Sequence, residues 1–259
     1  GGSQIIQTNQ SDLVTSITGE IERDQQGTAS SYNYNYWSSS VGPKNAGSTN
    51  SNYTIASVLR DGRTGTPAAI TFSTNYKAAD NANILNPLSP MVISTYWLRT
   101  YNAINNTYSQ WSNPLNPNTS QLAPGDGFTM KGVNGSAAFT DFHNLTFVGR
   151  PYNGDISLSI AAGNDRLIGN PYPSAIDANE FILDNISDGA GRNSVNILYG
   201  VLYFWHHFSK TNHNLGEYVG GYATYTLIGG AEAYSNDARI NDSQVETFPG
   251  SGVWEYPKG

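Results

Sequence analysis

Three of the four histidines, His206, His207 and His213, lie within eight positions of one another, and such clustering can build a metal site. The segment around His206 and His207 is predicted to be a strand, in which neighbouring side chains point to opposite faces of the sheet. Both imidazoles could then bind one ion only through an irregular backbone. We therefore predict ordinary hydrogen bonding at a strand end and no metal site.

Carboxylates are the second group that could do chemistry, because a secreted glycosidase needs two acids across a cleft. No motif pairs any of the candidates Asp155, Asp165, Asp177, Glu180, Asp184 and Glu217. Serine catalysis has no Gly-x-Ser-x-Gly motif to support it. Oxygen ligands for Ca²⁺ occur around Asn164-Asp165 and from Asp184 to Asp188, but an Asp-x-Asp-x-Asp-Gly loop is absent. We predict no enzyme and no cofactor, with a secreted glycoside hydrolase and Ca²⁺ as the respective alternatives.

Aromatic side chains are the strongest binding candidates. Tyr32, Tyr34 and Tyr36 alternate along one predicted strand, which places them on one face and Trp37 on the other. Such a face could stack on sugar rings or bury against a neighbouring subunit. The alternative is a half-buried sheet face covered within the same chain. Trp254, in the late polar segment, is expected to be exposed.

Composition excludes several classes of protein. The 259 residues carry a net charge of -7, with only 13 Lys and Arg, so a nucleic-acid partner is not expected. Cysteine is absent, which excludes disulfides and thiolate chemistry. No apolar window is long enough to span a membrane as a helix, so direct membrane insertion is not expected. Aromatic residues make up 12% of the chain, enough apolar surface for a folded core.

Short β-branched and aromatic runs between Gly, Asn and Pro turns predict an all-β fold, mainly antiparallel and sandwich-like. Predicted strands include Ser16–Arg23, Val92–Asn102, Gly154–Ile160 and Asp165–Gly169. Helical spacing of apolar residues predicts one short helix near 174–186, opened by Pro173 and capped by Ser174 or Asp177. We expect the prolines and glycine of the string Gly169, Asn170, Pro171, Tyr172 and Pro173 to fix a structural turn before it.

A weak internal repeat suggests two β lobes, 1–150 and 151–259. Thr95–Tyr101 resembles Leu202–Phe208, and the strand that follows Leu122 in the first half has no counterpart in the second. The second lobe is therefore expected to lack its closing strand. An unpaired sheet edge is normally covered or used for pairing. A neighbouring copy could supply the strand through Gln4, Ile5, Ile6 and Gln7, which would give a head-to-tail filament.

Six segments carry a family resemblance, in this order: Ser3–Gln7, Tyr34–Gly42, Leu122–Gly132, Leu167–Asp177, Leu202–Phe208 and Gly220–Tyr225. Together they resemble a module of large secreted surface proteins of the Bacteroidota, substrates of the type IX secretion system. The Gly-Asn-Pro-Tyr-Pro-Ser string at 169–174 is its most specific element. The chain departs from the pattern at Ser40, where the family often has proline, and in ending before the usual closing strand and sorting tail.

The resemblance implies an extracellular location, on the cell surface or in a secreted appendage, and implies no catalytic residues. We therefore expect a non-enzymatic structural or adhesive protein, a possible filament or matrix subunit whose partner is a further copy of the chain or a neighbouring surface protein. The alternative is a carbohydrate-binding module of a secreted enzyme or adhesin, with polysaccharide as its partner.

Overall fold

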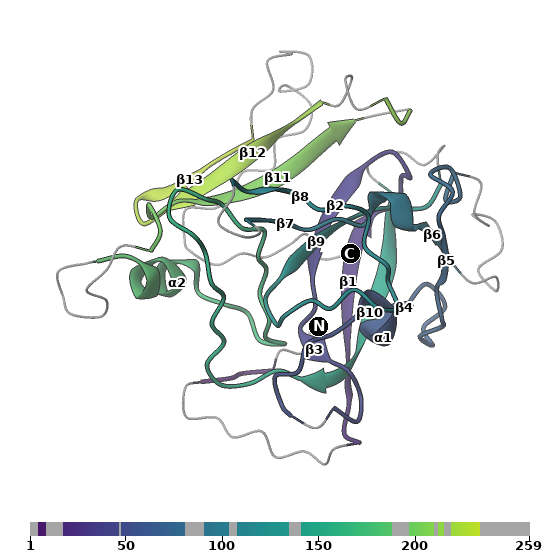
Figure 1. The fold of residues 1–259 in the computed structure, drawn as a ribbon, viewed down its shortest axis with the longest axis horizontal. Coiled ribbons are helices and arrows are strands. Elements are labelled where there is room, and N and C mark those ends of the chain that lie inside the picture. Colours follow the sequence, from purple (N-terminus) through teal and green to yellow (C-terminus); the bar gives the residue numbers. More distant parts are fainter. Residues whose placement is uncertain are drawn as a thin grey trace. The chain divides into compact units, whose positions relative to one another are not determined.

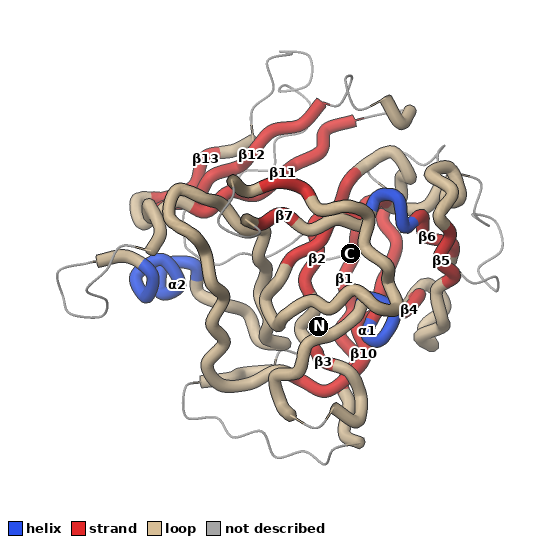
Figure 2. The backbone as a smooth tube through the Cα atoms, viewed as in Figure 1, coloured by secondary structure: helices blue, strands red, loops and turns tan. Residues whose placement is uncertain are grey.

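The computed structural model describes residues 5–8, 18–46, 48–80, 91–103, 108–134, 141–187, 197–209, 212–214 and 219–233. Strands predominate among the regular elements of these residues, and the helices are short (Figure 2). Within the described ranges, the strand pairs are antiparallel except β5 (Thr71–Ser73) with β6 (Val92–Ser94). The predicted all-β, mainly antiparallel class is confirmed. Within these ranges no helix is long and apolar enough to cross a membrane.

The chain divides into two compact units, residues 1–175 and 176–259, each described by itself below. In unit 1, the largest sheet has the order β1-β10-β3, and β4 also pairs with β10 (Figure 1). Two further antiparallel pairs are β2 with β9 and β7 with β8. The bounds are β1 Ile21–Thr28, β2 Tyr34–Ser38, β3 Val41–Gly42, β4 Leu59–Asp61, β7 Tyr101–Asn102, β8 Gln110–Trp111, β9 Gly127–Lys131 and β10 Phe142–Pro151.

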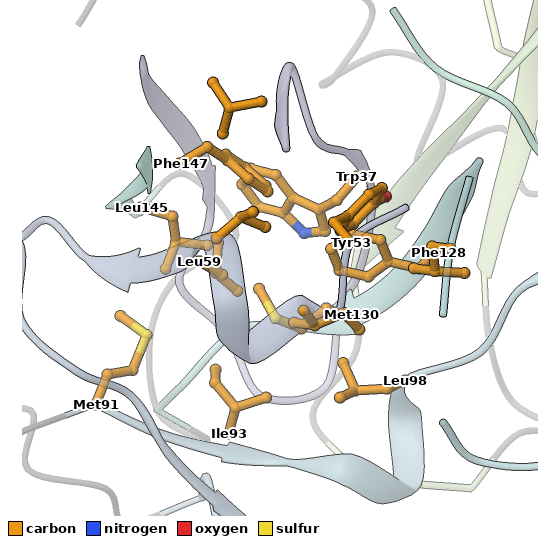
Figure 3. Close-up of a cluster of buried hydrophobic side chains, with 14 of the residues drawn as sticks. Trp37, Tyr53, Leu59, Met91, Ile93, Leu98, Phe128, Met130, Leu145 and Phe147 are labelled. Carbon is orange, nitrogen blue, oxygen red and sulfur yellow. The ribbon is translucent and has the colours of Figure 1, made fainter. Parts of the chain in front are cut away.

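The core of unit 1 forms where β2 and β9 pack on β10. Trp37 of β2 pairs across the strands with Phe128 of β9, so both side chains point to the same face. The Trp37 ring lies 6.1 Å from that of Phe147 on β10, and Figure 3 shows Trp37 within the cluster of buried side chains. Phe128 and Phe147 are fully buried. This apolar burial holds the β2–β9 pair against the larger sheet.

Two local predictions for unit 1 differ from the structure. The segment predicted as one strand from Val92 to Asn102 is interrupted by the 3-10 helix η1 (Thr95–Trp97), so it does not repeat the continuous strand that begins at Leu202. A four-residue helix, α1 (Ile55–Val58), was not predicted. It is capped at Thr54 and buries Ile55 and Val58, so tertiary packing stabilises a helix too short to form alone.

Residues 151–175 fold with unit 1, whereas the sequence suggested a boundary near residue 150. Tyr152 is fully buried, and its hydroxyl donates to the carbonyl of Ser51 at 2.9 Å. Farther along, Leu167 bonds through its backbone to Tyr101 and Gly127. The strands predicted at Gly154–Ile160 and Asp165–Gly169 are not formed, apart from one bridge between Asp126 and Ile168. The segment is instead held by isolated hydrogen bonds.

Unit 2 contains helix α2 (Ala178–Asn185) and a sheet of order β11-β12-β13, with β11 Leu202–Ser209, β12 Val219–Thr226 and β13 Gly229–Ala231. The helix confirms the predicted short helix. Asp177 caps it, accepting backbone N–H bonds from Asn179 and Glu180. Ile182 of α2 packs with Tyr225 of the sheet, joined by Leu202 and Phe204. The predicted lack of a closing strand in the second lobe concerns the chain after residue 233, which lies outside the described ranges.

Candidate functional site

The Gly169–Pro173 string forms a turn fixed to unit 1. The side-chain amide of Asn170 donates to the Ser174 carbonyl at 2.6 Å, and its Oδ1 accepts from the Tyr172 backbone at 2.8 Å. A Cβ at Gly169 would lie 2.4 Å from the Cβ of Ser38, so only glycine permits this close approach. Pro171 and Pro173 are buried and follow trans peptide bonds. The contacts within the string are structural.

The N-terminal segment predicted for strand contact is partly attached to unit 1. Gln7 donates through its amide to the carbonyl of Tyr152 at 2.8 Å and accepts from the backbone of Ser174 at 3.3 Å. Residues 5–8 form no strand. Ile5 and Ile6 are exposed, Ile6 by 83%. Gln4 lies outside the described residues, as does Trp254.

The predicted tyrosine face is covered by tryptophans of its own chain. Tyr34 and Tyr36 share one face of β2, but Tyr32 precedes the strand in a turn. Trp97 contacts Tyr34 edge-on with ring centroids 6.0 Å apart, and Trp111 contacts Tyr36 at 6.1 Å. Both tyrosines are half-buried. The structure therefore matches the alternative interpretation, a sheet face covered within one chain.

Lys131, on β9 opposite Tyr34, is enclosed by this aromatic cover. Its side chain is buried, and Nζ lies 3.5 Å from the centroid of the Trp97 ring and 4.8 Å from that of Tyr34. Burial lowers the pKa of Lys131 to about 7, against the opposite effect of the Asp80 carboxylate. Burial likewise raises the pKa of the Tyr34 hydroxyl. The Lys131 amine packs against both rings, so the residue joins β9 to η1.

The outer edge of this cluster is the tyrosine pair Tyr76 and Tyr96, with ring centroids 6.1 Å apart and each side chain 43% exposed. Cations of the chain lie over both rings. Nζ of Lys77 is 5.4 Å from the centroid of Tyr76, and the guanidinium of Arg99 is 5.6 Å from that of Tyr96. Unit 1 thus supplies its own partners for these ring faces.

A second aromatic surface lies on β11 and β12 in unit 2. The register pairs Trp205 with Tyr222 and Tyr203 with Thr224, and cross-strand partners share a face. The opposite face carries Phe204 and the other residues that pack with α2. Tyr203 is 64% exposed and Tyr222 is 49% exposed. We call the three rings Tyr203, Trp205 and Tyr222 the β11–β12 aromatic face.

The rings of this face hold one another at steep angles. Trp205 and Tyr222 have centroids 5.1 Å apart and an interplanar angle of 65°, while Tyr203 and Tyr222 are 6.2 Å apart at 87°. The indole leans across β12 onto Gly220, where an added Cβ would lie 2.4 Å from its Cζ2 atom. Gly220 therefore makes room for the ring. The geometry presents apolar rings on a rigid strand pair, suited to stacking on a ligand.

Two histidines and two carboxylates that could bind a metal or act in catalysis lie on opposite sheet faces or have structural hydrogen-bond partners. The register puts His207 opposite Gly220 and His206 opposite Gly221, so the two lie on opposite faces of the sheet. No group of three or more His, Asp or Glu able to hold a metal ion occurs in the described ranges. Asp177 caps α2, and Asp126 accepts two hydrogen bonds from the guanidinium of Arg166. These two carboxylates have structural partners.

Sequence reasoning did not select the β11–β12 aromatic face. The feature that could have identified it is the alternation in Leu202–His207, where Tyr203 and Trp205 fall on one face while Leu202 and Phe204 fall on the other. Both faces are apolar in such a strand, so alternation alone does not say which face is buried. Residues of α2 decide this by covering the Leu202 side.

The fold and these surfaces define the molecule as an antiparallel β protein with an exposed aromatic face. The chain belongs to the family Domain of unknown function (DUF8693), whose model matches residues 2–248. No curated protein and no solved structure matches it.

Proposed function

We propose that the chain is a non-catalytic, extracellular surface module that adheres to polysaccharide through the β11–β12 aromatic face. The observation that carries the proposal is the pair of exposed tyrosines, Tyr203 and Tyr222, fixed beside Trp205 on paired strands. Aromatic rings held rigidly offer large contact area at low cost in conformational entropy. The charge-poor composition and the resemblance to secreted Bacteroidota surface proteins support the extracellular location.

In this proposal unit 1 has a structural role and does not bind the polysaccharide. Its aromatic cluster is largely covered by its own tryptophans and cations, and the turn at 169–173 fixes the segment that leads into unit 2. Adhesion then needs no catalytic group, which agrees with the structural partners of Asp126 and Asp177.

The test compares two tyrosine pairs in the full chain. The double variant Tyr203→Ala/Tyr222→Ala removes the proposed contact, and Tyr76→Ala/Tyr96→Ala is the matched control, because its rings lie at a similar separation and are also exposed. Beads carrying each protein are tested for retention on surfaces coated with purified polysaccharides. We expect retention by the wild type and the control and its loss in the first variant. Equal retention by all three proteins would contradict the proposal.

Self-association is a second candidate, favoured by the exposed Ile5 and Ile6 next to the anchored Gln7. Two adjacent exposed isoleucines can be buried against a further copy of the chain. Sedimentation velocity of the wild type over a concentration series should then show association that Ile6→Asp abolishes. A monomer throughout the series rejects this candidate and leaves adhesion through unit 2 unaffected.

A further inference from the structure

We infer that the ligand of the β11–β12 aromatic face is a single, soluble, neutral polysaccharide chain, as opposed to a crystalline or an anionic one. This inference rests on the proposed function and names the class of ligand for the same surface. Two properties of the face support this inference: the angles between its rings and the absence of charged residues along its strands.

The angles exclude a flat ligand. A crystalline polysaccharide presents a planar surface, which several rings can contact together only if they are nearly coplanar. Tyr222 instead meets Trp205 at 65° and Tyr203 at 87°. A free chain can turn between successive sugars, so it can offer a ring face to one aromatic and an edge or a hydroxyl to the next.

Gly220 fixes this arrangement. Because Gly220 has no Cβ, the indole of Trp205 can lie close to the backbone of β12, where its plane makes an angle of 65° with that of Tyr222. Trp205 also contacts the ring of His207 edge-on, at 6.2 Å and 88°. The ring is therefore bounded by the backbone of Gly220 and the side chain of His207, which favours the same angle in the free protein.

The lack of charged residues on these strands favours a neutral polysaccharide as the ligand. The sequences Leu202–Ser209 and Val219–Thr226 contain no Asp, Glu, Lys or Arg. Anionic polymers are bound through Lys and Arg, and neither occurs in these two strand sequences. In unit 1, by contrast, the exposed rings of Tyr76 and Tyr96 lie beneath Lys77 and Arg99. Thr224, opposite Tyr203, instead supplies a hydroxyl able to donate to or accept from a sugar hydroxyl.

The experiment uses native affinity electrophoresis and pull-down with three sets of probes. Soluble neutral chains are xyloglucan, mixed-linkage β-glucan, galactomannan, amylopectin and dextran; crystalline particles are cellulose and chitin; anionic chains are alginate and chondroitin sulfate. The proteins are the wild-type chain, Tyr203→Ala, Tyr222→Ala, Trp205→Phe and the control Tyr96→Ala. Near-ultraviolet circular dichroism checks that each variant is folded.

We expect at least one neutral chain to retard the wild type, with affinity reduced about tenfold by Tyr203→Ala or Tyr222→Ala and unchanged by Tyr96→Ala. Raising the salt concentration should leave the affinity unchanged, because no ion pair forms. If Tyr203-dependent binding is seen only with crystalline or anionic probes, the inferred ligand class is wrong but the proposed function still stands. The absence of any Tyr203-dependent or Tyr222-dependent binding overturns both.

Discussion

Two exposed tyrosine pairs, Tyr76 with Tyr96 in unit 1 and Tyr203 with Tyr222 in unit 2, have similar ring separations but different surroundings. In unit 1 the rings lie beneath Lys77 and Arg99 and continue inward to Trp97. In unit 2 they stand on strands without charge. An exposed aromatic ring is therefore not by itself a binding residue: the groups that already contact its faces decide whether it stabilises the fold or is available to a ligand.

The largest effect is expected from Trp97→Ala in unit 1. The ring is buried, contacts Tyr34, Tyr96 and Lys131, and donates through Nε1 to the carbonyl of Tyr76 at 2.9 Å. Removing it should cost about 3–5 kcal/mol in the free energy of unfolding, measured in urea. Trp111→Ala, whose ring is 43% exposed, is the control and should cost clearly less. If both variants lost the same free energy of unfolding, the buried ring would contribute no more to stability than the exposed ring, which would contradict the contrast between covered and exposed rings.

Lys131 gives unit 1 a dependence on pH that can be isolated. Its pKa is about 7 in the folded protein and ordinarily 10.5, so the unfolded chain binds the extra proton between these values. The free energy of unfolding should therefore rise from about pH 7 to about pH 9, by an amount on the order of a few kcal/mol. Lys131→Met should remove this rise. Urea unfolding at several pH values measures it, and an unchanged slope in the variant would show that Lys131 is not its source.

Gly220→Ala tests how the aromatic face is positioned in unit 2. The new Cβ would collide with the indole of Trp205, which should cost about 1–3 kcal/mol in the free energy of unfolding and displace the ring. In a Trp205→Ala background the same glycine substitution should cost less, because the ring is gone and only the His206 carbonyl oxygen, 2.7 Å from the added Cβ, still obstructs it. A cost that is the same in both backgrounds would locate the effect in the backbone and not in the indole.

Tyr203→Ala should have the smallest effect on stability, within about 0.5 kcal/mol, because its ring is mostly exposed. Its effect on polysaccharide retention should be large. A thermal melt beside the retention assay separates these two quantities. Loss of binding accompanied by a comparable loss of stability would indicate a structural tyrosine and weaken the contrast between the units.

The fold class and the short helix could be predicted from sequence, because turn residues and the helical spacing of Ile176, Phe181, Ile182 and Ile186 are local features. The interruption of the strand predicted to begin at Val92 could not be predicted from sequence. It depends on groups far along the chain that stabilise η1, such as Thr129, whose hydroxyl donates to the Trp97 carbonyl. The candidate site likewise depends on contacts between residues that are distant in the sequence. Tyr34 and Tyr36 were selected for their alternation, but their cover by Trp97 and Trp111 comes from remote segments.

The most direct test of the central claim is fluorine NMR of the chain labelled with 5-fluorotryptophan, with resonances assigned by replacing Trp97, Trp111 and Trp205 singly with Phe. A neutral polysaccharide that retards the protein is titrated into the sample. We predict that the Trp205 resonance shifts while those of Trp97 and Trp111 stay in place. A shift at Trp97 or Trp111 with Trp205 unchanged would contradict it and move the binding surface to unit 1.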